Sequence, residues 1–68
     1  MKVKVFIQKL RETKIIELNE DSSIEELLKT LRISPSEVVP VINGIIVTEK
    51  EVLKEGDEVK LLSVVSGG

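Results

Sequence analysis

The chain has 68 residues, of which 41% are hydrophobic and 32% charged, and its 10 basic and 12 acidic residues give a net charge of −2. A chain of this length forms one domain with one core, and its apolar content excludes a disordered protein. It contains no histidine and no cysteine, which excludes an imidazole base, a thiol nucleophile and a Cys/His zinc site.

A β-hairpin is predicted at the start of the chain. Residues 2–7 alternate aliphatic side chains with charged or aromatic ones, which is the period-two pattern of a half-buried strand. The inward residues of this strand are Val3, Val5 and Ile7. A polar connection follows, and residues 14–18 form the returning strand with Ile16 and Leu18 turned inward.

One amphipathic helix is predicted after the hairpin. Ser22 with Glu25, or Ser23 with Glu26, has the spacing of a capping box, in which the hydroxyl accepts from a free amide at the helix start. Four aliphatic residues share one helical stripe: Ile24, Leu27, Leu28 and Leu31. Residues 34–37 have the pattern of a second helix start, with proline at the first helical position. Too few residues follow for more than a single helical turn.

Two strands joined by a tight turn are predicted next. Residues 38–42 are apolar but contain Pro40, which has no amide hydrogen, so this strand pairs poorly on one side or lies at an edge. The pair Asn43-Gly44 predicts a tight turn, because both residue types tolerate positive φ. Residues 45–48 leave this turn as a short strand.

The last strand is predicted over residues 59–65, after a turn at residues 55–58. In the polar segment before that turn, Val52 and Leu53 are expected to face the core. The order strand, strand, helix, strand, short strand, strand predicts an α+β protein with a mixed four- to five-stranded sheet packed on one main helix. The first and last strands are expected side by side in its middle.

The sequence ends with Ser66-Gly67-Gly68 directly after the last predicted strand. Two glycines form a thin tether that can enter a narrow active-site channel, and a terminal carboxylate is ionised at neutral pH. Such a carboxylate can attack the α-phosphorus of ATP and form an acyl adenylate. Taken alone, an untethered tail or a cloning remnant explains this ending equally well.

The ending and the segment before it resemble those of the ThiS and MoaD sulfur carriers. Residues 56–68 contain a Gly-Asp turn, an apolar strand and a final Gly-Gly, and Val41-Ile42-Asn43-Gly44 resembles the segment that precedes the last strand in those families. The resemblance covers essentially the whole chain. It implies the ubiquitin-like β-grasp fold, with a domain over residues 1–65 and a tail over residues 66–68.

The resemblance also implies a function. In these families an enzyme of the ubiquitin-activating type adenylates the terminal glycine, which becomes a thiocarboxylate that donates sulfur to a synthase. Here the activated residue would be Gly68, with Gly67 and Ser66 giving access to it. The chain would be a carrier and not an enzyme, with no bound cofactor, while its partner uses ATP and magnesium.

Several branches stay open for the pathway. The length is nearer to that of ThiS than of MoaD, yet many ThiS proteins carry an aromatic or basic residue where this chain has residues 48–51. The Phe-Pro-Pro type of segment common before the MoaD tail is replaced by Ser63-Val64-Val65. An archaeal small modifier, serving tRNA thiolation or joined to protein lysines, is a third possibility, and a β-grasp binding module without acyl chemistry is a fourth.

A docking surface for the activating enzyme is expected on the outer face of the sheet. If the odd-numbered residues of the last strand point toward the helix, its even-numbered residues point outward. The outward apolar residues are then Phe6, Leu62 and Val64, together with Val41 if the register of its strand agrees. Such a cluster beside the tail suits a protein partner, although these residues could simply cover the sheet.

Other partners are excluded by composition. Lysine and glutamate are mixed without a basic run, which excludes nucleic-acid binding through a positive surface. No apolar stretch approaches the roughly 20 residues that cross a bilayer, and residues 1–5 do not form a secretory segment. The carboxylates at residues 49–51 and 57–58 are explained by solvated turns, so no metal site is assigned. We expect a cytoplasmic protein that is monomeric when free.

Overall fold

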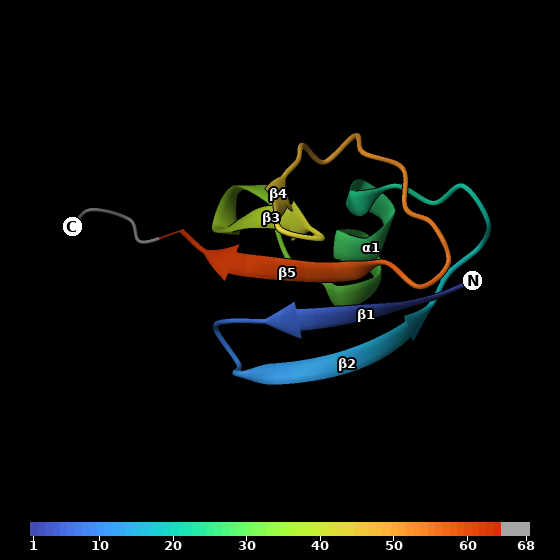
Figure 1. The fold of residues 1–68 in the computed structure, drawn as a ribbon. Helices are drawn as coiled ribbons and strands as arrows, with labels where there is room; N and C mark the ends of the chain where they lie inside the picture. Colours follow the sequence, from blue (N-terminus) through green and yellow to red (C-terminus); the bar gives the residue numbers. More distant parts are fainter. Residues whose placement is uncertain (65–68) are drawn as a thin grey trace.

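The computed structural model describes residues 1–64, in which one α-helix packs on a five-stranded mixed sheet (Figure 1). In chain order the elements are β1 (Lys2–Ile7), β2 (Glu12–Glu17), α1 (Ile24–Leu31), the 3-10 turn η1 (Pro35–Glu37), β3 (Val38–Ile42), β4 (Ile45–Ile46) and β5 (Glu58–Ser63). The strand order is β2-β1-β5-β3-β4, with β1 and β5 parallel and every other pair antiparallel. The predicted pairing of the first and last strands is confirmed. The predicted domain boundary after residue 65 lies outside the described residues.

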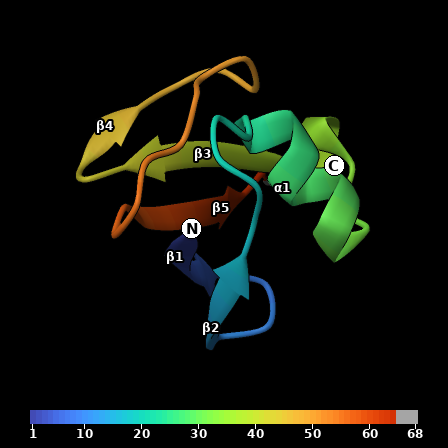
Figure 2. The ribbon, with the colours of Figure 1, turned by 90° about the vertical axis from the view of Figure 1, so that its right-hand side faces the viewer.

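The core lies between the sheet and α1, which occupies one side of the strands (Figure 2). The side chains that are at most 3% exposed on β1, β5 and α1 are Val3, Val5, Ile7, Val59, Leu61, Ile24, Leu27 and Leu28. The period-two and helical patterns predicted for these elements are therefore confirmed. Burial of each such aliphatic side chain stabilises the fold by roughly 1.5–3 kcal/mol. Ile16, Leu18 and Leu31 are half-buried at the margin of this core.

The start of α1 is capped by one of the two predicted serines. Ser23 accepts a hydrogen bond from the backbone amide of Glu26, with 3.4 Å between Oγ and N. Ser22 is 3% exposed and donates instead to the carbonyl oxygen of Asn19 at 2.8 Å. At the other end Arg32 adopts the left-handed conformation, with φ of 59°, and closes the helix.

Strand β3 lies inside the sheet and pairs poorly on one side, which confirms the first of the two alternatives predicted from Pro40 and rules out the edge position. It pairs with β5 along its whole length but with β4 through only two residue pairs. Val47 donates to the carbonyl of Pro40 at 3.0 Å, and Pro40 has no N–H to return. Since a hydrogen-bonded antiparallel pair exchanges two such bonds, the ladder stops here and β4 covers only residues 45–46.

The segment between β4 and β5 corrects one predicted core residue. Leu53 is 2% exposed as expected, but Val52 is 48% exposed. Val52 forms an isolated antiparallel bridge with Ser23, and Leu53 donates to the carbonyl of Ser22 at 2.8 Å. Adjacent residues of an extended segment point to opposite sides, so only one of this pair can face the core.

Candidate functional site

The end of β5 is held in place on both sides. Ser63 donates its backbone amide to Gln8 Oε1 at 2.8 Å, and the amide of Gln8 donates to the carbonyl of Leu61 at 3.1 Å. Val64 donates to the carbonyl of Glu37 at 3.0 Å. The chain is therefore anchored through residue 64, immediately before the segment that leads to the predicted tail. The residues predicted for activation and access lie outside the described residues: Ser66, Gly67 and Gly68.

The position of this strand end follows from the topology. Strand β5 is central and parallel to β1, so its last residues lie beside the end of β1 and away from Met1 (Figure 1). The connection after β1 lies on one side of the end of β5. The turn η1 and the start of β3 lie on its other side. A segment that continues from Val64 starts from the middle of one end of the sheet.

The outer face of the sheet, opposite α1, brings three of the predicted docking residues together. Phe6 is in register with Lys60, and Lys60 is in register with Val41. Leu62 lies in the next row toward the strand end, in register with Val39. Residues in register share a face, so the expected outward direction of Phe6, Val41 and Leu62 agrees with the pairing.

The exposure of the predicted docking residues differs. Phe6 and Leu62 are half-buried, and Val64 is 46% exposed. Val41 is only 7% exposed, because it lies in register between Lys60 on β5 and Ile46 on β4. It can support an apolar surface but offers little area of its own. Val64 follows the end of β5 and lines a depression with Lys9 and Glu37.

Besides Ile15 on β2, which is 62% exposed, two apolar residues of the outer face were not anticipated. Ile46 is 71% exposed and lies opposite Val41, and Val39 is half-buried opposite Leu62. The position of Ile46 could have been predicted from the Asn43-Gly44 turn. A two-residue turn pairs Ile42 with Ile45, and hence Val41 with Ile46. We define the outer-face patch by the apolar residues of this face on β1, β3, β4 and β5, without Ile15 on β2: Phe6, Val39, Val41, Ile46 and Leu62.

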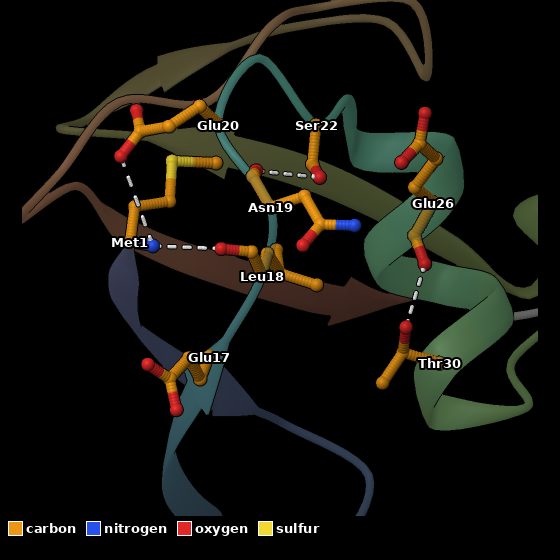
Figure 3. Close-up of a pocket in the computed structure, with 8 residues that line it drawn as sticks. All are labelled: Met1, Glu17, Leu18, Asn19, Glu20, Ser22, Glu26 and Thr30. Atoms are coloured by element: carbon orange, nitrogen blue, oxygen red, sulfur yellow. Dashed lines mark hydrogen bonds and ion pairs between the residues drawn. The ribbon is translucent and has the colours of Figure 1, made fainter.

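A second depression lies at the opposite end of the sheet, around the amino terminus (Figure 3). The Met1 amino group donates to the carbonyl of Leu18 at 2.7 Å and lies 3.9 Å from Glu20 Oε1. Thr30 Oγ1, on α1, donates to the carbonyl of Glu26 at 3.0 Å. These contacts join the start of β1 to the β2–α1 connection and complete a turn of α1, so they are explained by the fold.

The acidic turns have similar explanations. Asp57 Oδ2 accepts from the backbone amide of Lys54 at 2.8 Å, and Asn43 Oδ1 accepts from that of Glu58 at 3.3 Å. Within residues 1–64, no group of three or more acidic side chains is placed to hold a metal ion. Nor does any helix in this part of the chain have the length and apolarity to cross a membrane.

Comparison with known proteins relates the whole chain to one family. A sequence model of the ThiS family matches residues 3–68. SAMP1 from Haloferax volcanii superimposes with a TM-score of 0.79 over 100% of both chains, at 17% identity. A Pyrococcus furiosus protein assigned as subunit 1 of a molybdopterin converting factor gives 0.77 over 94% of this chain and 98% of that one, at 25% identity.

A third similar structure comes from a complex. The complex of subunits 1 and 2 of the molybdopterin-converting factor from Helicobacter pylori contains a chain that superimposes with a TM-score of 0.73 over 100% of both chains, at 23% identity. A protein designed on the basis of ubiquitin superimposes with a TM-score of 0.68 over 100% of this chain and 95% of that one, at 22% identity. These likenesses confirm the predicted ubiquitin-like β-grasp fold.

Proposed function

Because the chain belongs to the ThiS family of ubiquitin-like sulfur carrier proteins, we propose that a partner enzyme adenylates the carboxylate of Gly68 and that this group then becomes a thiocarboxylate. The observation that carries the proposal is the anchored end of β5. Its last amides are bonded to Gln8 and Glu37, and the family match continues from there to Gly68. A rigid domain that ends in a short two-glycine segment is suited to present a carboxylate to another protein.

The proposed chemistry has two steps. First, a carboxylate oxygen of Gly68 attacks the α-phosphorus of ATP, the bond to the β-phosphate breaks, and pyrophosphate leaves. Second, a sulfur nucleophile such as hydrosulfide attacks the acyl carbon, the bond from carbon to the phosphate oxygen breaks, and AMP leaves. In this proposal the partner supplies the nucleotide site, the magnesium and the sulfur donor, while the chain, which contains no histidine or cysteine, supplies the carboxylate.

The outer-face patch is the proposed docking surface for that partner. It combines half-buried Phe6 and Leu62 with the exposed Ile46, and Leu62 immediately precedes Ser63 at the strand end. An apolar cluster is what the buried core of a protein interface requires, since charged residues are depleted there. A partner bound to this face is close to the start of the segment that leads to Gly68.

The product then passes to a sulfur-accepting synthase. Thiamine synthesis, molybdopterin synthesis and tRNA thiolation are the three candidate destinations. The similar Helicobacter pylori chain belongs to a complex of subunits 1 and 2 of the molybdopterin-converting factor. We therefore expect the thiocarboxylate of Gly68 to transfer its sulfur to a subunit of a synthase. The competing fate of the activated Gly68 is attachment to a lysine amine of another protein.

The first step can be tested by ATP–pyrophosphate exchange. The chain is mixed with an adenylating enzyme of the ubiquitin-activating type from the genome that encodes it, with magnesium, ATP and labelled pyrophosphate. We expect exchange that depends on the full chain and stops when Gly67 and Gly68 are deleted. Exchange that is absent with every such enzyme, or that survives the deletion, would contradict the proposal and favour a binding module without acyl chemistry.

A further inference from the structure

A groove of about 320 Å³ lies beside the end of β5, on the side of the sheet that carries α1. Its apolar part consists of Ile7, Leu10, Ile33 and Val38, and its cationic part of Lys9 and Arg32. These residues come from the end of β1 and the connection after it, from the residues that directly follow α1, and from the start of β3. The adjoining depression shares Lys9 with the groove and includes Val64, so the two reach the last described residue of the chain.

The positive charge at this groove is not balanced by the acidic side chains nearby. Lys9 and Arg32 are exposed, as is Arg11 in the same connection as Lys9. Glu37 also lines the groove and contributes one negative charge, with its Oε2 accepting from a backbone amide at the start of η1 at 3.2 Å, so the three cations outnumber it. Glu12 lies 3.9 Å from a lysine of its own strand. Among residues 1–64, neither of the two ion pairs within 4 Å involves these three cations.

The acidic side chains concentrate at the other end of the sheet. The β2–α1 connection and the segment between β4 and β5 carry six of them against two lysines, Lys50 and Lys54; the six are Glu20, Asp21, Glu49, Glu51, Glu55 and Asp57. Both segments lie near the start of β1, since the Glu20 carboxylate is close to the Met1 amino group and the backbone carbonyl of Asp57 accepts from the amide of Lys4 at 3.0 Å. A chain with a net charge of −2 therefore has a local cationic end where β5 finishes.

We propose that this groove receives an acidic segment of the adenylating partner, at the mouth of the channel that takes up the tail. An aliphatic side chain of that segment would lie on Leu10 and Ile33, and its carboxylates would reach Lys9 and Arg32. Charge complementarity identifies this occupant, because an acidic surface attracts the cationic end and repels the acidic one. The inference rests on the proposed function and adds a second contact, on the opposite side of the sheet from the outer-face patch.

The charges of the groove also explain how the chain approaches the adenylating partner with the end of β5 first. Exposed charges act over about 8 Å at physiological ionic strength, so their main effect is on the rate and orientation of encounter. Removing them should raise the KM for the chain in adenylation and leave kcat unchanged, because the acyl chemistry takes place at Gly68. The effect should also weaken as salt is added.

The experiment compares two charge reversals of lysine. Lys9→Glu changes the groove, whereas Lys50→Glu makes the same change in net charge on an exposed residue near the acidic end. A third variant, Arg32→Asn, removes the second cation; asparagine suits this position because φ is 59°. Initial rates of adenylate formation are measured over a range of chain concentrations at low and high salt. Urea unfolding verifies that each variant is folded.

We expect Lys9→Glu to raise KM about tenfold at low salt, with a smaller rise for Arg32→Asn and less than about twofold for Lys50→Glu. Equal KM values for Lys9→Glu and the unchanged chain would overturn the inference, and so would a rise that is the same at every salt concentration. Adenylation of the unchanged chain would then still support the proposed function. Absence of adenylation from every variant and from the unchanged chain would instead overturn the proposed function itself.

Discussion

The side-chain oxygen of Gln8 accepts a hydrogen bond from the backbone amide of Ser63 at 2.8 Å, across 55 positions of sequence. The amide of Gln8 also donates to Leu61, the residue two positions before Ser63. Gln8 therefore extends the pairing of β1 with β5 beyond the last residue of β1. The side chain takes the place of a backbone carbonyl at the point where β5 ends, and it fixes the base from which the chain continues toward Gly68.

Gln8→Ala should loosen the end of β5 without unfolding the domain. The amide of Ser63 loses its acceptor, so its hydrogen exchange measured by NMR should accelerate while that of the buried amide of Val59 changes little. We expect a loss of about 0.5–1.5 kcal/mol in the free energy of unfolding. Gln8→Glu retains an acceptor oxygen and should restore slow exchange. Unchanged exchange at Ser63 in Gln8→Ala would show that the side chain does not hold the strand end.

The helix cap gives a second prediction. Ser23→Ala removes the acceptor for the amide of Glu26 and should lower the free energy of unfolding by about 1 kcal/mol in urea titrations. Ser23→Asp, the matched variant, keeps an acceptor and adds a negative charge at the helix start, so it should match or exceed the original stability. If Ser23→Ala and Ser23→Asp unfold at the same urea concentration, the capping bond contributes nothing.

The outer-face patch gives a third prediction, on binding. Leu62→Glu or Phe6→Glu places a charge in an apolar contact and should raise the KM for the chain in adenylation about thirtyfold, which corresponds to about 2 kcal/mol. Ile15→Glu is the control, because Ile15 is 62% exposed and lies on the same face in register with Lys4. An unchanged KM in a folded Leu62→Glu variant would mean that the patch only covers the sheet.

Much of the fold could be predicted because short-range patterns determine it. The alternation in β1 and β5 identified Val5 and Leu61 as inward residues, and both are fully buried. Val52 could not be separated from Leu53 in the same way, because a polar segment without periodicity does not reveal which neighbour faces the core. The position of β3 inside the sheet depends on long-range strand pairing and could not be predicted. The poor pairing of one side of β3 was predictable, because Pro40 has no amide hydrogen.

The candidate site was only partly predictable. The outward direction of Val41 could be predicted only on condition of the register of its strand, and its 7% exposure depends on which residues lie beside it in that register. Lys9 and Arg32 are 23 positions apart and meet through the ends of β1 and α1, so no local pattern links them. The contact of Gln8 with Ser63 is equally long-range. Gly68 was identified from its resemblance to a family and its place after a strand.

The central claim is that the carboxylate of Gly68 carries the chemistry, and intact-mass spectrometry tests it most directly. The chain is incubated with ATP, magnesium, hydrosulfide and the adenylating enzyme, beside a variant with one alanine appended after Gly68. We predict that the original chain gains the mass difference between sulfur and oxygen and that the extended variant does not. An unchanged mass for the original chain, or the same gain in the extended variant, would contradict the assignment of Gly68.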